Sequence, residues 1–127
     1  SDDSGLCIKA LAGKPGVFSA RLAKKKGSFF KAMKFILKKM KKKKNRSAIF
    51  VSSLSFISNK NNIYSVTGKI NGTISKKILG KKGFGYDPIF IPKNHTLTFG
   101  QMAKSKKILI DHRYIAFKKL KKRVKTL

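Results

Sequence analysis

The sequence predicts one small domain of the α plus β class. The chain has 127 residues, of which 41% are hydrophobic, so one core can form and a second domain has no room. Apolar residues recur at helical spacing over 28–43, and strand-like runs occupy 47–57, 63–66 and 69–74. Most of the strands therefore come from the middle of the chain.

The first third is expected to contain a strand, a turn and a helix. Leu6, Ile8 and Ala10 alternate with other residues, which indicates a short strand, and glycines at 13–16 then break the chain. The helix over 28–43 has one apolar face, made by Phe29, Met33, Ile36, Leu37 and Met40. Such a basic amphipathic helix can lie on a membrane or a partner, but we favour packing against the core, with its lysines in solvent.

The middle of the chain predicts an antiparallel meander. A strand from Ser47 to Ile57 is followed by an asparagine-rich turn at 59–62. Two further strands, at 63–66 and 69–74, are expected to join through Gly68, with a bend at Gly72.

The last third is predicted to mix loops, one strand and helices. A glycine-punctuated loop over 80–92 leads into an apolar strand at 89–91. A short helix is expected over 99–106, and Asp111 is a suitable N-cap for a final helix.

The charge is strongly one-sided. Lys and Arg number 32 against four acids, so the net charge is +28, and there is no glutamate. Such a chain attracts polyanions. Only four of the cations are arginines, the residue that nucleic-acid readers prefer, so we interpret the excess as mainly compositional bias. A non-catalytic basic protein that binds polyanions is kept as the alternative.

Composition also excludes several classes of protein. No run approaches the roughly 18 apolar residues of a membrane span, which argues against an integral membrane protein. The single cysteine, Cys7, excludes an internal disulfide framework and a cysteine zinc site. No export signal opens the chain, so a cytoplasmic location is expected.

Three clusters of residues are candidates for chemistry. Asp2-Asp3-Ser4-Gly5 offers two adjacent carboxylates, which suit Mg²⁺ or Mn²⁺; the alternative is an exposed turn without function. Gly83-Phe84-Gly85-Tyr86-Asp87-Pro88 offers a close backbone approach, aromatics that stack on a base and an acceptor for a base N–H; the alternative is a hairpin with buried aromatics. Lys107, His112 and Arg113 gather near a predicted helix start, where an anion or a carbonyl oxygen is favoured; the alternative is a structural histidine.

These motifs occur in an order that resembles a known family. Asp2-Asp3-Ser4-Gly5-Leu6 is followed by the stretch from Gly13 to Arg21 (GKPGVFSAR), the stretch from Gly83 to Phe90 (GFGYDPIF), Lys107, and His112-Arg113. The chain is similar over nearly its whole length to the inosine triphosphatase family of purine nucleoside triphosphate pyrophosphatases.

The resemblance implies a homodimeric α/β enzyme with a mixed central sheet flanked by helices. Residues 1–127 would form a single partial domain, about the C-terminal two thirds of such an enzyme. The family hydrolyses the inosine, deoxyinosine and xanthosine triphosphates (ITP, dITP and XTP) to the monophosphate and pyrophosphate, with Mg²⁺ or alternatively Mn²⁺.

The resemblance also implies roles for individual residues. Asp3 matches the catalytic acid and metal ligand, with Asp2 supporting the metal and Ser4 touching the substrate. Phe84 matches the residue that stacks on the base, and Gly85, Tyr86 and Asp87 shape the base pocket. Lys107 matches a nucleotide-contacting lysine, and His112 and Arg113 match the pair that reads the oxygen at purine position 6.

Several positions depart from the family pattern. The phosphate loop and the metal-binding glutamate that precede these motifs are absent, and Lys9, Leu22, Gln101 and Asp111 replace the usual residues. We therefore expect the polypeptide alone to be weakly active or inactive, either as a fragment of a longer chain or as a degenerate copy.

Overall fold

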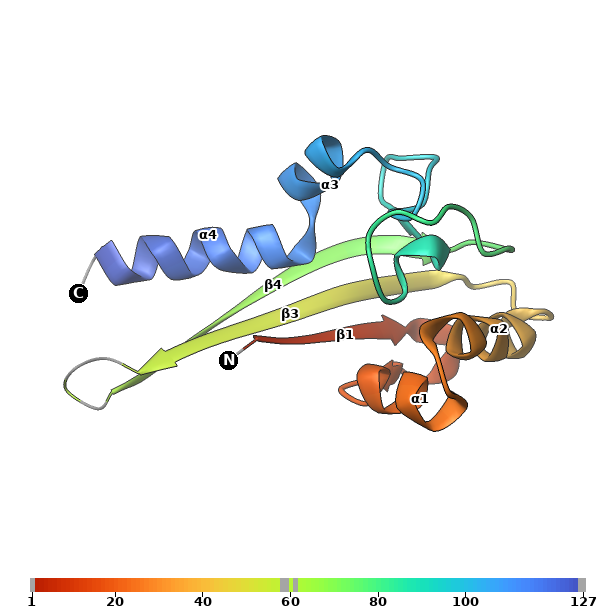
Figure 1. Cartoon of the computed structure of the whole chain (residues 1–127), viewed down its shortest axis with the longest axis horizontal. Coiled ribbons are helices and arrows are strands. Elements are labelled where there is room, and N and C mark those ends of the chain that lie inside the picture. Colours follow the sequence, from red (N-terminus) through yellow and green to blue (C-terminus); the bar gives the residue numbers. More distant parts are fainter. Residues whose placement is uncertain (1, 58–59, 61, 126–127) are drawn as a thin grey trace.

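One antiparallel sheet organises the chain (Figure 1). The computed structural model describes residues 2–57, 60 and 62–125; the side chains of residues 2–3, 56–57, 108–110, 112–114 and 123–125 lie outside this description. The sheet has the order β2-β1-β3-β4-β5, and every pairing in it is antiparallel. Its strands are β1 (Asp2–Ile8), β2 (Lys14–Gly16), β3 (Ser47–Ile57), β4 (Ile63–Ile74) and β5 (Phe90–Pro92).

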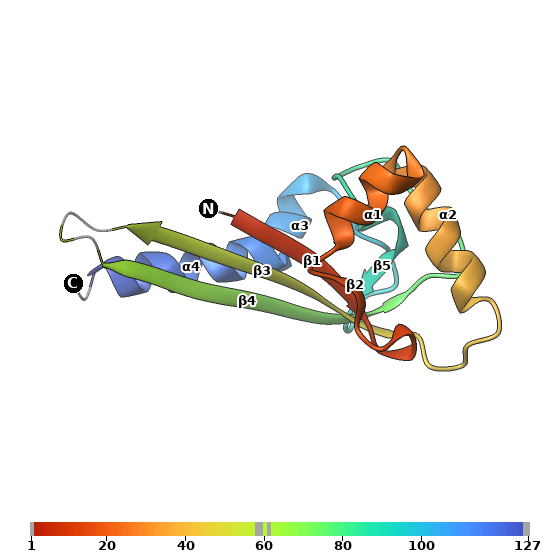
Figure 2. The same ribbon diagram turned by 90° about the horizontal axis from the view of Figure 1, so that it is seen from below.

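Helices flank this sheet at both of its ends (Figures 1 and 2). They are α1 (Ser19–Lys26), α2 (Phe29–Met40), α3 (Lys104–Ile110) and α4 (His112–Lys125), with short 3₁₀ turns η1 (Lys9–Leu11) and η2 (Asp87–Ile89). The expected α/β fold with a central sheet flanked by helices is confirmed. The described strands pair only in the antiparallel sense, whereas the resemblance implied a mixed sheet.

β3 and β4 form a long hairpin that runs the length of the molecule (Figure 1). The prediction of two separate strands over 63–74 is wrong, because Gly68 pairs with Ser52 without interrupting β4. Gly72 is needed for a close approach instead, since a Cβ there would lie 2.6 Å from the Phe90 ring. The predicted turn at 59–62 lies partly outside the described residues.

α2 packs its apolar face into the core, as predicted. Ala32, Met33, Ile36 and Met40 are buried in one cluster with strand residues such as Leu6. The helix begins after Ser28, whose hydroxyl accepts the Lys31 N–H at 3.0 Å and so caps the first turn. The lysines on the opposite face are exposed, so the amphipathic pattern of α2 is explained by packing of its apolar face against the core.

α1 was not predicted from the sequence. It has eight residues, too few for an isolated helix to be stable in water, and it depends on contacts with its neighbours. Ser19 supplies two of them: its hydroxyl accepts the Leu6 N–H at 2.9 Å and donates to the Gly16 carbonyl at 2.7 Å. The first residue of α1 is thereby tied to both β1 and β2.

Arg46 joins the end of α2 to the sheet. Its guanidinium donates to the carbonyl oxygens of Met40, Ile74 and Ser75 at 2.7–3.0 Å. These acceptors come from α2, the end of β4 and the residue after it. Because a guanidinium offers five donors in a fixed plane, one side chain can satisfy carbonyls from separate segments.

The helix predicted over 99–106 is displaced along the chain. Phe99 and Met102 lie in a buried turn, and α3 begins only at Lys104. The expected strand at 89–91 is found one residue later, as β5. α4 then runs along β3 and β4, and no helix within the described residues is long and apolar enough to cross a membrane.

Candidate functional site

The glycine-rich loop at 83–87 folds back onto the carboxylate of Asp87. Gly83 and Gly85 have φ angles of +72° and +62°, which glycine adopts without strain. The Phe84 N–H donates to Asp87 Oδ2 at 3.0 Å, and a Cβ on Gly83 would collide with that same oxygen. The two glycines therefore allow a tight turn around a buried carboxylate, with the Phe84 ring half exposed on its outside.

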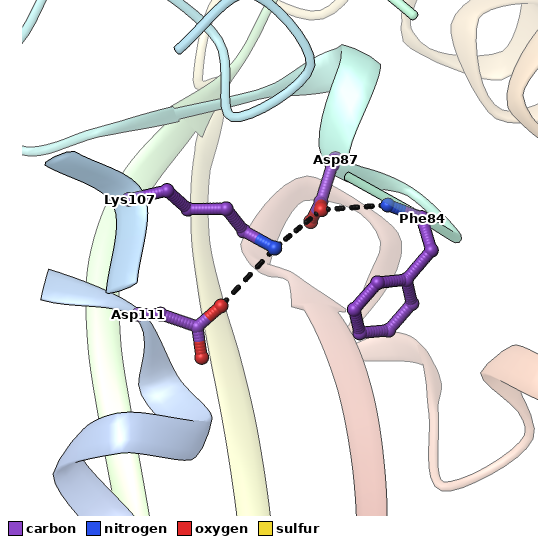
Figure 3. A network of polar contacts seen from close by, with 4 residues as sticks. All are labelled: Phe84, Asp87, Lys107 and Asp111. Atoms are coloured by element: carbon purple, nitrogen blue, oxygen red, sulfur yellow. Dashed lines mark hydrogen bonds and ion pairs between the residues drawn. The ribbon is translucent and has the colours of Figure 1, made fainter. Parts of the chain in front are cut away.

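Lys107 lies between two carboxylates beneath this loop (Figure 3). Its Nζ is 2.7 Å from Asp87 Oδ2 and 3.2 Å from Asp111 Oδ2, and all three side chains are at most 9% exposed. The ammonium also lies over two rings, 4.8 Å from the centre of Phe84 and 5.5 Å from that of Phe99. A lysine from α3 thus connects the 83–87 loop to the residue that precedes α4.

Burial raises the pKa of Asp87 by more than Lys107 lowers it. Loss of water raises the pKa of the Asp87 carboxyl, while hydrogen bonds and charge attraction from Lys107 and the Phe84 N–H lower it; the net direction is upward. A second carboxylate, Asp111, adds to the rise through like-charge repulsion. The network therefore holds one cation between two acids in a water-poor setting.

Tyr86 fixes the loop to the opposite wall of the site. Its buried hydroxyl donates to the Ser19 carbonyl at 2.6 Å, and its ring meets Phe29 edge-on at 5.2 Å. Burial raises the pKa of Tyr86 to about 12, so the hydroxyl stays protonated and remains a donor. Tyr86 thus links the 83–87 loop to the start of α1 and the start of α2.

A cavity of about 570 Å³ lies between this loop, β1, the start of α1 and β3. Its volume is in the range of small-ligand sites. Five of the predicted site residues line it: Ser4, Phe84, Gly85, Tyr86 and Asp87. The structure therefore brings Ser4 and Gly5 of the first predicted cluster to one cavity with the second cluster, and Lys107 of the third contacts its wall through Asp87.

Ser4 is a polar group at this cavity without a partner. Its Oγ is buried, and no hydrogen-bond acceptor or donor contacts it among the described residues. Such an atom costs free energy unless a ligand or water satisfies it, so it marks a position where a bound molecule can make a hydrogen bond.

Asp2 and Asp3 are placed by their backbone alone. They begin β1, opposite Leu54 and Ser53, and Ser53 lines the cavity. Their side chains lie outside the described residues, as do those of His112 and Arg113. The latter two begin α4, directly after Asp111 of the buried network.

The sequence predicted other roles for two residues that the structure places at the site. Asp111 was expected to cap the last helix and was noted as a departure from the family pattern, and in the structure its carboxylate pairs with Lys107. Phe29 was assigned to the core face of a helix, yet it is 40% exposed and lines the cavity. The Lys107–Asp111 spacing of four residues was the available signal for the first, while nothing in the sequence signalled the second.

Relatives of known description match nearly all of the chain. The Ham1 family profile matches residues 1–123. A dITP/XTP pyrophosphatase of Clostridium tetani is 40% identical over 126 residues, which is 99% of this chain and 63% of that protein. One from Caulobacter vibrioides is 42% identical over 123 residues, covering 95% and 63%. The chain thus spans slightly less than two thirds of the length of these relatives.

Solved structures agree with these matches. The Ham1 protein of Staphylococcus aureus superposes with a TM-score of 0.92 at 34% identity, covering 98% of this chain and 65% of that one. A HAM1 protein from Coxiella burnetii gives 0.91 at 34%, covering 100% and 66%. Sequence and fold therefore lead to the same conclusion: the chain belongs to the Ham1 family.

Proposed function

We propose that the protein hydrolyses ITP, dITP and XTP to the nucleoside monophosphate and pyrophosphate. The observation that carries this proposal is the meeting of Ser4 and the 83–87 loop at one nucleotide-sized cavity, with Lys107 buried behind it. Relatives that match nearly the whole chain are named dITP/XTP pyrophosphatases. Because the chain spans only part of their length, their activity is a proposal for it.

The purine base would bind against Phe84. That ring is 54% exposed and lines the cavity, and the Lys107 ammonium lies 4.8 Å from its centre, so the ring offers a planar ligand an aromatic surface to stack on. Gly85 leaves room for the ligand to approach the backbone, and Tyr86 keeps the loop in place. The substrate would complete the hydrogen bonding of Ser4.

His112 and Arg113 would select the 6-oxo purine. Both side chains can donate hydrogen bonds, and the carbonyl oxygen of hypoxanthine or xanthine accepts them. Adenine presents an amino group there, which leaves these donors unpaired, and each unpaired buried donor costs about 1–3 kcal/mol. The assignment rests on the motif and on the position of both residues directly after Asp111.

Asp2 and Asp3 would hold a Mg²⁺ ion, or alternatively Mn²⁺. The donor set suits such an ion, because it favours oxygen ligands and binds through one or two carboxylates together with substrate phosphates. When bound, the ion would neutralise charge on the phosphates. Asp3 would act as the catalytic acid of the motif, orienting the attacking water. The chain contains no glutamate to add a further ligand, so we expect slow turnover by this polypeptide.

Two further expectations concern the setting of the protein. The resemblance implies a homodimer, and the lone cysteine favours a reducing compartment such as the cytoplasm. Both stay predictions. Sedimentation of the purified chain at several concentrations tests the first.

Purine selectivity provides the direct test of the proposed function. Inosine and adenosine monophosphates are titrated into the chain by calorimetry, with and without Mg²⁺, and pyrophosphate release is followed from ITP and ATP. We expect inosine monophosphate to bind at least tenfold more tightly and ITP to be the better substrate. Equal affinities together with equal rates would reject the proposal, as would the absence of binding to either purine.

A further inference from the structure

The segment made of α1, α2 and the turn that follows α2 is rich in cations. Eleven lysines lie between residues 24 and 44: Lys24, Lys25, Lys26, Lys31, Lys34, Lys38, Lys39, Lys41, Lys42, Lys43 and Lys44. All except Lys26 are exposed. We call these residues the α1–α2 cationic face; Figures 1 and 2 both show its two helices at the end of the molecule opposite the free end of α4.

No acid of the described structure neutralises this face. Residues 4–86 contain no Asp or Glu at all. The described carboxylates of Asp87 and Asp111 are both engaged by Lys107 in the buried network. The ammonium groups of the face therefore repel one another, and a polyanion would relieve that repulsion and release its own counterions.

Aromatic rings lie among these lysines. Phe30 is 55% exposed, and the Lys34 ammonium lies 5.4 Å from the centre of its ring. The half-buried Phe35 ring has Lys26 at 3.9 Å and Lys39 at 5.1 Å, so one ring joins cations from both helices. Exposed rings between phosphate-binding cations are the combination that binds single strands, because bases stack on the rings.

The burial of α2 argues against a lipid surface as the partner. An amphipathic helix binds lipid by inserting its apolar face, but the apolar face of α2 is packed in the core. A nucleic-acid strand needs only the exposed face. All eleven residues of the face are lysines, and α1 adds one exposed arginine, Arg21, so bidentate reading of base edges is limited to that residue.

We infer that the α1–α2 cationic face binds single-stranded nucleic acid without sequence preference. Lysines of the face contact successive phosphates, and Phe30 stacks on a base. This inference is independent of the proposed pyrophosphatase activity, since the face uses none of the residues assigned to purine binding or to the metal.

Two triple variants that lose the same number of charges distinguish binding at the α1–α2 cationic face from attraction of nucleic acid by the net charge of the whole chain. Lys31, Lys34 and Lys38 lie along the exposed side of α2, and Lys31→Gln/Lys34→Gln/Lys38→Gln removes three charges there. Lys69→Gln/Lys121→Gln/Lys122→Gln removes three exposed charges from β4 and α4. Binding of a labelled 20-nucleotide uridine strand is measured by fluorescence anisotropy across a salt series.

We expect the α2 triple to weaken binding at least about tenfold at 0.1 M salt and to reduce the slope of log affinity against log salt by about two. The control triple should weaken it less than threefold. Phe30→Ala, with circular dichroism to check folding, should weaken binding at least about fivefold while leaving the salt slope unchanged.

Other results would overturn the inference. Equal losses in the two triples would show attraction by net charge alone, and no loss for Phe30→Ala would exclude stacking. Vesicles of phosphatidylserine and phosphatidylcholine serve as the competing partner. If they bind the chain through the same three lysines and are not displaced by the uridine strand, the face is a lipid-binding surface.

Discussion

The buried network around Lys107 and the α1–α2 cationic face differ in how their charges meet solvent. In the network, one ammonium and two carboxylates are at most 9% exposed and each has a partner. On the cationic face, exposed ammonium groups have no acid near them in the described structure. A chain with only four acids thus places two of them around a single lysine.

The difference teaches where charge matters for stability. A buried ion that loses its partner keeps the cost of its lost hydration, so removing one member is expensive. An exposed ion keeps its water, so removing it changes little. Site-directed changes should therefore have large effects on folding at the network and small ones on the face.

The largest effect is expected from Lys107→Met. This change keeps an unbranched side chain that is one atom shorter and removes the Lys107 ammonium from two buried carboxylates, and we expect it to lower the free energy of unfolding by about 3–5 kcal/mol. Urea denaturation followed by circular dichroism measures it. The control is Lys106→Met at the exposed neighbouring position, which should cost less than about 0.5 kcal/mol. Similar losses in both variants would remove the distinction between buried and exposed charge.

Gly83→Ala should have the next largest effect, and Gly13→Ala is its matched control. Both glycines have φ near +80°, at 72° and 83°, so either alanine carries a backbone cost of about 1–2 kcal/mol. A Cβ at Gly13 meets nothing within 4 Å, whereas one at Gly83 collides with the Asp87 carboxylate. The loss in Gly83→Ala should therefore exceed that in Gly13→Ala by at least about 1 kcal/mol. Equal losses in thermal and urea unfolding would mean that the contact with Asp87 is unimportant.

The sequence predicted the elements whose signals are local. The alternation and β-branched residues of 47–57 placed β3 at its observed bounds, and the apolar stripe of 28–43 placed α2. The motif at 83–88 was correctly predicted to lie in a glycine-punctuated loop, and its role in base binding stays a prediction. Local patterns are enough for β3 and α2 because buried positions recur at the period of each element, as at Ala48, Phe50 and Ser52 of β3.

Other features depend on contacts between distant residues and could not be predicted in this way. α1 is too short to be stable alone and is fixed by Ser19 against β1. Gly68 was expected to join two separate strands, but it pairs with Ser52 of β3 and β4 continues through it. The ion pair between Asp87 and Lys107 joins residues 20 positions apart, and only the tertiary fold reveals it.

Phe84→Ala should separate binding from folding. The ring is 54% exposed, so its removal should change the free energy of unfolding by less than about 1 kcal/mol. If the base stacks there, the affinity for inosine monophosphate should fall about tenfold, since stacking on one aromatic is worth about 1–3 kcal/mol. Calorimetry on the variant, next to its unfolding curve, tests both halves of this expectation. An unchanged affinity would remove Phe84 from the purine site.

The pH dependence of stability shows whether burial or Lys107 has the larger effect on the pKa of Asp87. Burial raises its pKa above the usual 3.8, so between that value and the folded pKa the native state binds more protons than the unfolded chain. Stability from this group should therefore fall as pH rises through the window, by at most about 1.4 kcal/mol per pH unit. The measurement is the difference in free energy of unfolding between the parent chain and Asp87→Asn. We expect this difference to be greatest at acidic pH. A difference that grows with pH would mean that Lys107 outweighs burial.

The smallest effect on folding is expected at the α1–α2 cationic face. The triple replacement of Lys31, Lys34 and Lys38 by glutamine removes exposed ammonium groups that repel their neighbours. Each change should alter the free energy of unfolding by no more than about 0.5 kcal/mol. Because the lost interactions are repulsive, the triple variant should gain free energy of unfolding relative to the parent chain at low salt. High salt should abolish this gain. Urea unfolding at 0.02 M and 0.5 M salt checks this, because the Debye length is well above about 10 Å at the lower concentration and well below it at the higher one. A salt-independent loss of several kcal/mol would mean that these lysines stabilise the fold, and the contrast with Lys107 would then fail.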